Sequence, residues 1–206
     1  MHKTIIQRGA EAVLYLSQED GREVLVKERT AKGYRVPELD RKIRSQRARR
    51  EHNIMEKARA AGLDVPRTSL SDDCTIRMDY VRGERLKDVF NGMKPEERAK
   101  VCEKVGLAVA KLHSAGIMHG DLTTSNMIID KDGRLFLIDF GLAKLSNKAE
   151  DYAVDLFLLY EAIKSTHFSH LEEAWKTVIK AYVHNYVNSE AVLERMEGIK
   201  KRRRYK

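Results

Sequence analysis

Cysteine, proline and long apolar runs are scarce in this chain of 206 residues, which has two cysteines and three prolines. Cys74 and Cys102 form neither a CxxC pair nor a Cys/His cluster, so we expect no disulfide framework and no zinc site, and we predict two reduced, packed thiols. No apolar stretch approaches the roughly 18 residues that a membrane-spanning helix needs. The start, MHKTIIQRGAEA, has no run resembling the core of a signal peptide. We therefore expect a cytosolic protein.

Acidic residues are fewer than basic ones: the chain has 39 Lys and Arg and 31 Asp and Glu, which gives a net charge of +8. Hydrophobic residues make up 42% of the chain, enough to bury a core, which excludes a mainly disordered protein. A cationic excess indicates an anionic partner only where it is concentrated. Here it gathers in two segments, the C-terminal KKRRRYK and a run that comprises Arg41, Lys42, Arg44, Arg47, Arg49 and Arg50.

The hydrophobic pattern divides the chain into a β-rich and a helical part. Alternating residues at 4–6, 12–16 and 24–27 predict an antiparallel meander, and an uninterrupted pattern over 37–61 predicts a long helix. Two short strands are expected at 68–70 and 75–80. Beyond them we expect a helix at 95–115, a hairpin of 127–129 with 134–138, and helices at 149–164, 169–187 and 189–204. The prediction is an α+β fold with one lobe over residues 1–82 and a second over 83–206.

The sharpest motif is HGDLTTSN at 119–126, followed after the predicted hairpin by DFG at 139–141. The pair resembles the catalytic and metal-binding segments of the protein-kinase-like superfamily. Phosphoryl transfer needs an oriented attacking oxygen and a divalent cation beside the phosphates. Asp121 is suited to accept a proton from a hydroxyl or water, and Asn126 and Asp139 offer the oxygen ligands that Mg²⁺ prefers. Each residue alone would more often be structural, and we expect His119 to be a packed histidine that holds the loop.

Upstream, VLVK at 24–27 resembles the strand whose lysine holds the α and β phosphates in such enzymes. Side chains alternate between the two faces of a strand, so Leu25 lies on the same face as Lys27. We therefore expect Leu25 to cover the adenine and Ile128 to lie below the base. Glu51 shares a helical face with neighbouring apolar residues, unlike Glu56, and is our predicted partner of Lys27. Alone, such a lysine and glutamate are more often solvated.

Three features narrow the resemblance further: the short chain, HGDLTTSNM, and IDFGLA followed closely by a helical segment. Together they resemble the small atypical kinase/ATPase of the KEOPS complex. This resemblance implies a bilobal protein-kinase-like fold with a small N-lobe containing one long helix and a reduced helical C-lobe. It also implies Mg²⁺ and ATP as cofactors, serine/threonine autophosphorylation or ATP hydrolysis, and a role in tRNA threonylcarbamoyladenosine synthesis. The implied partners are the catalytic threonylcarbamoyltransferase subunit, a small regulatory subunit that binds the N-lobe, and tRNA.

The resemblance places Gly9, Asp79 and Val81 among the nucleotide-binding residues. It also suggests that Asp155 anchors the catalytic loop, although an aspartate near a helix start could equally be a cap. Ordinary protein kinases differ from this chain at several points. Gly9 stands alone instead of in a G-x-G-x-x-G set, Gly120 replaces an arginine that reads an activation-loop phosphate, and no A-P-E segment follows DFG. Phospho-switch activation and general peptide phosphorylation are therefore not expected.

Two other functions fit the same motifs. One is a small-molecule phosphotransferase of the aminoglycoside or choline kinase type, which would need a helical substrate pocket, whereas only 67 residues follow Asp139. The other is a non-catalytic nucleotide sensor that carries RNA on a basic surface. With the KEOPS resemblance, the favoured tRNA-contacting residues are those of the basic tail: Lys200, Lys201, Arg202, Arg203 and Arg204. A solvated tail is the plainer alternative.

Overall fold

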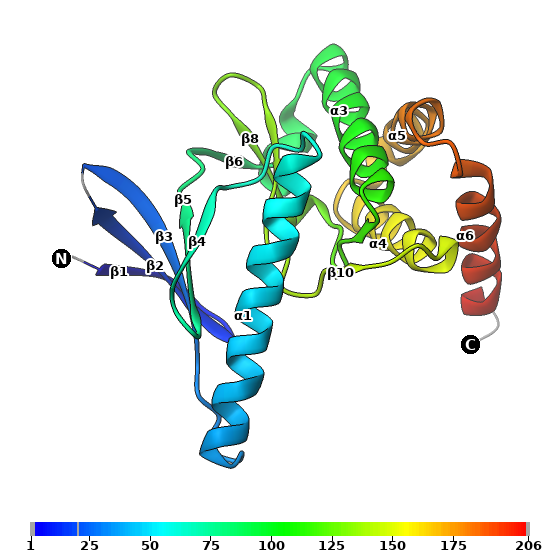
Figure 1. Ribbon diagram of the computed structural model, residues 1–206. Coiled ribbons are helices and arrows are strands. Elements are labelled where there is room, and N and C mark those ends of the chain that lie inside the picture. Colours follow the sequence, from blue (N-terminus) through cyan, green and yellow to red (C-terminus); the bar gives the residue numbers. More distant parts are fainter. Residues whose placement is uncertain (1–2, 20, 205–206) are drawn as a thin grey trace.

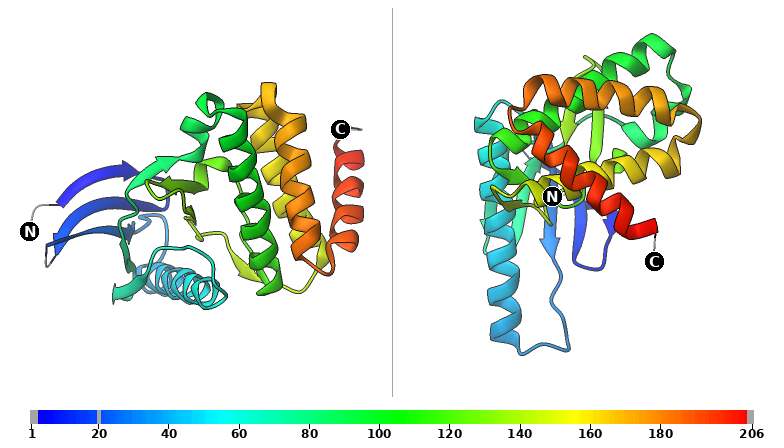
Figure 2. Two further views of the ribbon diagram at one scale, coloured as in Figure 1. Left: turned by 90° about the horizontal axis from the view of Figure 1, so that it is seen from above. Right: turned by 90° about the vertical axis from the view of Figure 1, so that its right-hand side faces the viewer.

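The computed structural model describes residues 3–19 and 21–204, which form a β-sheet flanked by one long helix and, beside them, a second part built mainly of helices (Figure 1). Seen from above, the sheet and the long helix occupy one side of the molecule and the helices the other (Figure 2). The predicted order, a β-rich part followed by a helical part, is confirmed. The division after residue 82 stays a prediction.

The first sheet is antiparallel, with strand order β1-β2-β3-β5-β4. Its strands are β1 (Lys3–Arg8), β2 (Ala12–Glu19), β3 (Arg22–Arg29), β4 (Thr68–Asp72) and β5 (Thr75–Asp79). The predicted meander is thus confirmed, with strands longer than the alternating segments. Strand β3 is central and pairs with both β2 and β5 along most of its length. This central position holds Lys27 on a strand supported from both sides.

Helix α1 (Pro37–Ala60) ends one residue before the predicted boundary. Pro37 lies in its first turn with acidic Glu38 and Asp40, and basic residues lie in its last turn, as the helix dipole favours. Gly62 follows with a φ of 79°, which suits glycine at a helix C-terminus. One face of α1 is buried, including Ala48, Glu51, Met55 and Ala58.

The second part begins with a strand that the sequence pattern missed. Its first elements are β6 (Gly83–Arg85), α2 (Leu86–Val89), η1 (Phe90–Gly92), α3 (Pro95–Ser114) and β7 (Ile117–Met118). They are followed by η2 (Thr124–Asn126), β8 (Met127–Asp130), β9 (Leu135–Leu137), β10 (Lys144–Leu145), α4 (Ala149–Thr166), η3 (Phe168–His170), α5 (Leu171–Asn185) and α6 (Ser189–Arg204). The β8–β9 hairpin was predicted, whereas β6 completes a three-stranded sheet by pairing with β8.

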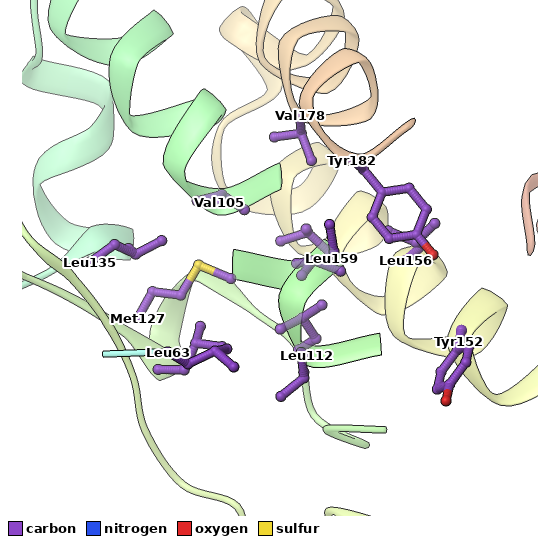
Figure 3. Packing of buried hydrophobic residues seen from close by; sticks show 14 of the residues in the cluster. Leu63, Val105, Leu112, Met127, Leu135, Tyr152, Leu156, Leu159, Val178 and Tyr182 are labelled. Carbon is purple, nitrogen blue, oxygen red and sulfur yellow. The ribbon is translucent and has the colours of Figure 1, made fainter. Parts of the chain in front are cut away.

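The main hydrophobic core lies between α3, α4 and α5, where Val105, Leu156, Leu159, Val178 and Tyr182 pack together (Figure 3). Helices α3 and α5 approach each other closely at Gly106. A Cβ there would lie 2.3 Å from the carbonyl oxygen of Val178, so no larger residue fits without a shift of the backbone. The segment after α3 therefore starts from a rigid support, and this segment carries the HGD motif.

Both cysteines are buried and free, as predicted. Burial raises the pKa of Cys102 to about 12, so its thiol stays protonated. Within residues 3–19 and 21–204, no helix combines the length and apolar character that crossing a membrane requires.

Candidate active site

Lys27 and Glu51 form the ion pair that their sequence positions predicted. The Lys27 Nζ lies 2.7 Å from the Glu51 Oε1, and Glu51 is only 1% exposed. Burial alone would lower the pKa of Lys27, but the carboxylates of Glu51 and Asp139 outweigh it and raise that pKa. Lys27 therefore stays a cation. Glu56 instead pairs with Arg59 near the end of α1, so the choice of Glu51 is confirmed.

Asp139 lies on the other side of Lys27, with its Oδ1 2.8 Å from the Nζ. Desolvation would raise the pKa of Asp139, but the Lys27 ammonium lowers it, so the carboxylate is ionised. Among the described residues, Asp139 is the one non-glycine residue with a positive φ, 60°. Such left-handed backbone is rare for residues with a Cβ and is frequent at functional sites. The carboxylate is half-exposed and therefore accessible to a ligand.

Asp121 and Asn126 lie together in the catalytic loop. The Asn126 side-chain nitrogen donates to the Asp121 backbone oxygen at 2.9 Å and to its carboxylate Oδ2 at 2.8 Å. These two bonds use both amide protons, so the amide oxygen remains as an acceptor. The Ile138 backbone N–H donates to the backbone oxygen of Asn126 at 3.0 Å, which joins the loop to the strand that leads to Asp139. The hairpin thus returns the chain to the loop, as expected.

The loop is anchored at its start by Asp155 from α4. This buried carboxylate accepts the backbone N–H groups of His119 at 2.6 Å and Gly120 at 2.8 Å. Because Asp155 lies well inside α4, the alternative that it caps the helix is wrong. His119 is fully buried, and its Nε2 donates to the Ile138 oxygen at 3.2 Å. Burial lowers the pKa of His119, so the ring is neutral and holds the loop, as predicted.

The segment after Asp139 is tied to α1 and to the loop. Arg50 donates its Nε–H to the Ala143 oxygen at 2.9 Å. Gly120 has a φ of 81°, and a Cβ there would lie 2.6 Å from the Leu142 oxygen. An arginine at position 120 would therefore collide with this segment, which gives a steric reason for the departure from ordinary protein kinases.

The other predicted nucleotide-binding residues lie around these groups. Gly9 closes the β1–β2 turn, where its N–H donates to the Ala12 oxygen at 2.9 Å. Leu25, half-buried on β3, packs against a small cluster that includes Ile76 and Met78. Asp79 ends β5, Val81 follows it, and Ile128 lies on β8. If Gly83 carried a Cβ, that atom would lie 2.7 Å from the Cγ2 of Ile128. Strand β8 therefore packs closely against Gly83, where the second part of the chain begins. Their roles toward a nucleotide stay predictions.

The two cationic segments differ in their surroundings. Within α1, Arg41 and Arg49 pair with Asp73, Arg44 pairs with Asp40, and Arg47 contacts Glu11. This first cluster is therefore largely satisfied by local acids. In α6, the Lys200 Nζ lies 4.4 Å from the Tyr160 ring centroid and Arg202 lies 2.9 Å from Glu150.

Arg29 was not among the residues predicted from the sequence. This buried side chain contacts Glu51 Oε2 at 2.6 Å, so Glu51 binds two cations from the same strand. The sequence contained a signal for it, because alternation of side chains along the strand puts Arg29 on the same face as Lys27. The role of Arg50 toward Ala143 was likewise not foreseen.

The chemistry of the donor set fits Mg-ATP. The Asp139 carboxylate and the Asn126 amide oxygen are hard ligands for Mg²⁺, and Lys27 offers a cation to phosphate. The described residues contain no cluster of three or more His, Cys, Asp and Glu able to hold a metal. A magnesium ion held by Asp139 and Asn126 would take its further ligands from phosphates and water. When bound, Mg-ATP would supply the transferable phosphoryl group and offset its charge.

Comparison with known sequences shows the family to which the chain is related. The protein kinase domain model matches residues 5–183. The chain is 44% identical over 187 residues to the KEOPS complex subunit Bud32 of Pyrococcus abyssi, an alignment that covers 87% of this chain and 84% of that protein. It is also 43% identical over 204 residues to a probable bifunctional tRNA threonylcarbamoyladenosine biosynthesis protein of Methanosarcina barkeri. That alignment covers 98% of this chain and 35% of the relative, so the chain spans about a third of such bifunctional proteins.

Comparison with solved structures gives the same fold. The Rio2 kinase from Chaetomium thermophilum, solved as an ADP/Mg²⁺-phosphoaspartate complex, superposes with a TM-score of 0.66. The match covers 97% of this chain and 70% of that one. At 16% identity, the likeness concerns the fold alone.

Proposed function

The chain belongs to the protein kinase family and, within it, to the family of the KEOPS subunit Bud32, and from this we propose that it uses Mg-ATP to support tRNA threonylcarbamoyladenosine synthesis. It does so as a KEOPS subunit, by phosphorylating serine or threonine of its own chain, by hydrolysing ATP, or both. The observation that carries the proposal is the Lys27 ammonium held between Glu51 and Asp139.

The polar groups divide the work of phosphoryl transfer in this proposal. Lys27, held by Glu51, binds the phosphates, and Asn126 and Asp139 hold the magnesium ion. Asp121 orients the attacking hydroxyl or water and accepts its proton. Asn126 fixes the Asp121 carboxylate through the bond at 2.8 Å, which limits the orientations the base can adopt. His119 and Asp155 keep the loop in place from behind.

The test measures ATP turnover by the full chain alone, with tRNA, and with the catalytic threonylcarbamoyltransferase subunit. We expect turnover that responds to the subunit or to tRNA. Transfer to a metabolite hydroxyl without such a response would indicate a small-molecule phosphotransferase. If Asp121→Asn bound nucleotide and supported tRNA modification like the wild type, the protein would be a sensor and the catalytic proposal would be wrong.

The metal ligand is tested by Asp139→Asn, because asparagine tolerates the left-handed backbone better than alanine does. Loss of the carboxylate should lower Mg-dependent turnover by about 100-fold or more. The matched control is Asp132→Asn in the exposed turn between β8 and β9, which should leave turnover unchanged. Equal turnover in Asp139→Asn and wild type would contradict the assignment.

The basic end of α6 is proposed to contact the tRNA backbone. Substituting Lys200 or Arg202 would also remove their contacts with Tyr160 and Glu150, so the test substitutes Lys201, Arg203 and Arg204. The triple glutamine variant should make the dependence of log K on log salt shallower by up to about 0.9 per cation. Glutamine at Lys87 of α2 and at Lys131 in the β8–β9 turn, both exposed, serves as the control. An unchanged slope in the triple variant would show that the segment is a solvated bystander.

A further inference from the structure

Hydrogen bonds link three polar side chains from separate segments at the C-terminal end of the HGDLTTSN segment: the buried Thr124 and His167, and the exposed Asn91. Thr124 of η2 lies with its hydroxyl 3.1 Å from the His167 Nε2, and the His167 Nδ1 lies 2.8 Å from the Asn91 Oδ1. Thr124 is 3% exposed and His167 is 1% exposed. Their polar atoms therefore depend on each other, because water has little access. None of the tasks assigned above uses these residues.

The contacts of Asn91 fix the direction of the two hydrogen bonds that link Asn91, His167 and Thr124. The Asn91 side-chain nitrogen donates to the Thr166 oxygen at 3.1 Å, so its carbonyl oxygen faces His167. That oxygen only accepts, which puts the ring proton of His167 on Nδ1. The Nε2 is then a bare acceptor, and the Thr124 hydroxyl donates to it. Burial lowers the pKa of His167, with a smaller contribution from His170, which keeps the ring neutral and the Nε2 able to accept.

The imidazole ring has little freedom to turn away. Phe90, itself buried, packs against it with ring centroids 4.6 Å apart. Thr124 belongs to the short turn that ends at Asn126, and the Asn126 N–H closes this turn on the Thr123 oxygen at 3.0 Å. A hydroxyl fixed at position 124 thus fixes the turn from which Asn126 reaches Asp121.

We propose that Thr124 and His167 are positioning residues that hold the far end of the catalytic loop, opposite the anchor that Asp155 provides at His119 and Gly120. The loop is then fixed at both ends, with Asp121 between the two anchors. The inference rests on the proposed function, since the geometry that it protects is that of Asp121 and Asn126. Lys27 and Glu51 lie on other elements and do not depend on it.

The first test removes the hydroxyl. Thr124→Val keeps the volume of the side chain but leaves the His167 Nε2 without its donor. We expect kcat to fall by about 10- to 100-fold with KM for Mg-ATP within about twofold, because misplacement of a reacting group lowers the rate more than it lowers binding. Thr124→Ser restores the hydroxyl and should recover most of kcat. Thr177→Val, which removes a threonine hydroxyl from the surface of α5, is the matched control.

The second test separates the two nitrogens of His167. A glutamine amide reaches the place of Nε2 and can accept from Thr124, whereas an asparagine amide reaches only the place of Nδ1. His167→Gln should therefore keep several-fold more kcat than His167→Asn. The control is His184→Asn, at an exposed position on α5. Equal kcat in the glutamine and asparagine variants, or wild-type kcat in Thr124→Val, would overturn the inference.

Amide hydrogen exchange, which does not depend on turnover, tests the anchor separately from the proposed function. Amide hydrogen exchange over residues 121–128 should be about tenfold faster in Thr124→Val than in wild type or Thr124→Ser, with exchange in α3 and α5 unchanged. If wild type shows no turnover and this difference is present, the function proposed above fails while the anchor stands. If wild type turns over ATP and exchange is unaffected by Thr124→Val, the anchor fails while the function stands.

Discussion

Glu51 is shared by two cations, of which Arg29 is the more deeply buried. In the proposed function Lys27 exchanges partners when phosphates bind, whereas Arg29 lies 5% exposed against the Glu51 Oε2 and has no such task. Arg29 would therefore keep the carboxylate of Glu51 in place on the strand side of α1 when Lys27 turns to a nucleotide. The guanidinium suits this role because it stays charged when buried.

Substitution of Arg29 should lower stability strongly. Arg29→Met leaves the buried Glu51 carboxylate with only Lys27, and we expect the free energy of unfolding to fall by about 3 kcal/mol. Arg41→Met, which removes an exposed partner of Asp73, should change it by less than about 1 kcal/mol. Urea denaturation of both variants provides the measurement. Similar losses in the two would mean that the buried pair contributes no more than a surface one.

Between elements, the contact of Arg50 with Ala143 couples α1 to the segment after Asp139. Because Glu51 follows Arg50 directly, one turn of α1 contacts both Lys27 and the segment that follows Asp139. In kinases regulated by phosphorylation, such coupling depends on a charged loop. Here the acceptor is a backbone oxygen, so the two elements are joined without a modification.

Loss of this link should lower turnover more than stability. We expect Arg50→Met to reduce kcat about tenfold, because the Asp139 segment loses its contact with α1. Arg49→Met, the neighbouring residue, removes only an exposed pair with Asp73 and should retain wild-type kcat. Steady-state kinetics and urea denaturation on the same samples separate the two effects. A kcat for Arg50→Met equal to that of Arg49→Met would exclude the coupling.

The sequence predicted the elements that have strong local signals. Helix α1 was found because Pro37 and Gly62 frame an uninterrupted pattern, and the β8–β9 hairpin because Asp132-Gly133 forms its turn. Strand β6 was missed because its three polar residues become a strand only by pairing with β8. The helix expected at 169–187 starts as η3 and continues as α5 to Asn185, after the break at His167. That break, and with it the Thr124 anchor, depends on contacts between distant segments that a local pattern does not contain.

At the scale of the whole molecule, three neutral histidines are buried: His113, His119 and His167. Burial lowers the pKa of each below its usual value. The unfolded chain binds protons at these positions as pH falls through about 6.5, while the folded protein does not. The stability they contribute is therefore complete above pH 6.5 and is lost as pH falls toward their folded pKa values.

The free energy of unfolding should consequently decrease between pH 7.5 and pH 5.5, by up to about 1.4 kcal/mol per pH unit for each histidine. Urea titrations at several pH values give this slope. His167→Gln should make it shallower, whereas His184→Asn, at an exposed position, should not. A slope that is the same in wild type and His167→Gln would show that this ring does not resist protonation in the folded state.

The direct pair of Lys27 with Asp139 implies that the incoming ligand has an internal competitor. Nucleotide phosphates that draw Lys27 away would leave the Asp139 carboxylate without its cation, and a divalent ion bound by Asp139 would leave Lys27 with the Glu51 carboxylate, which Arg29 shares. Either ligand alone would therefore replace one favourable contact while weakening the charge balance on the opposite side. Both together satisfy both sides, so nucleotide and metal should bind synergistically, each strengthening the affinity for the other.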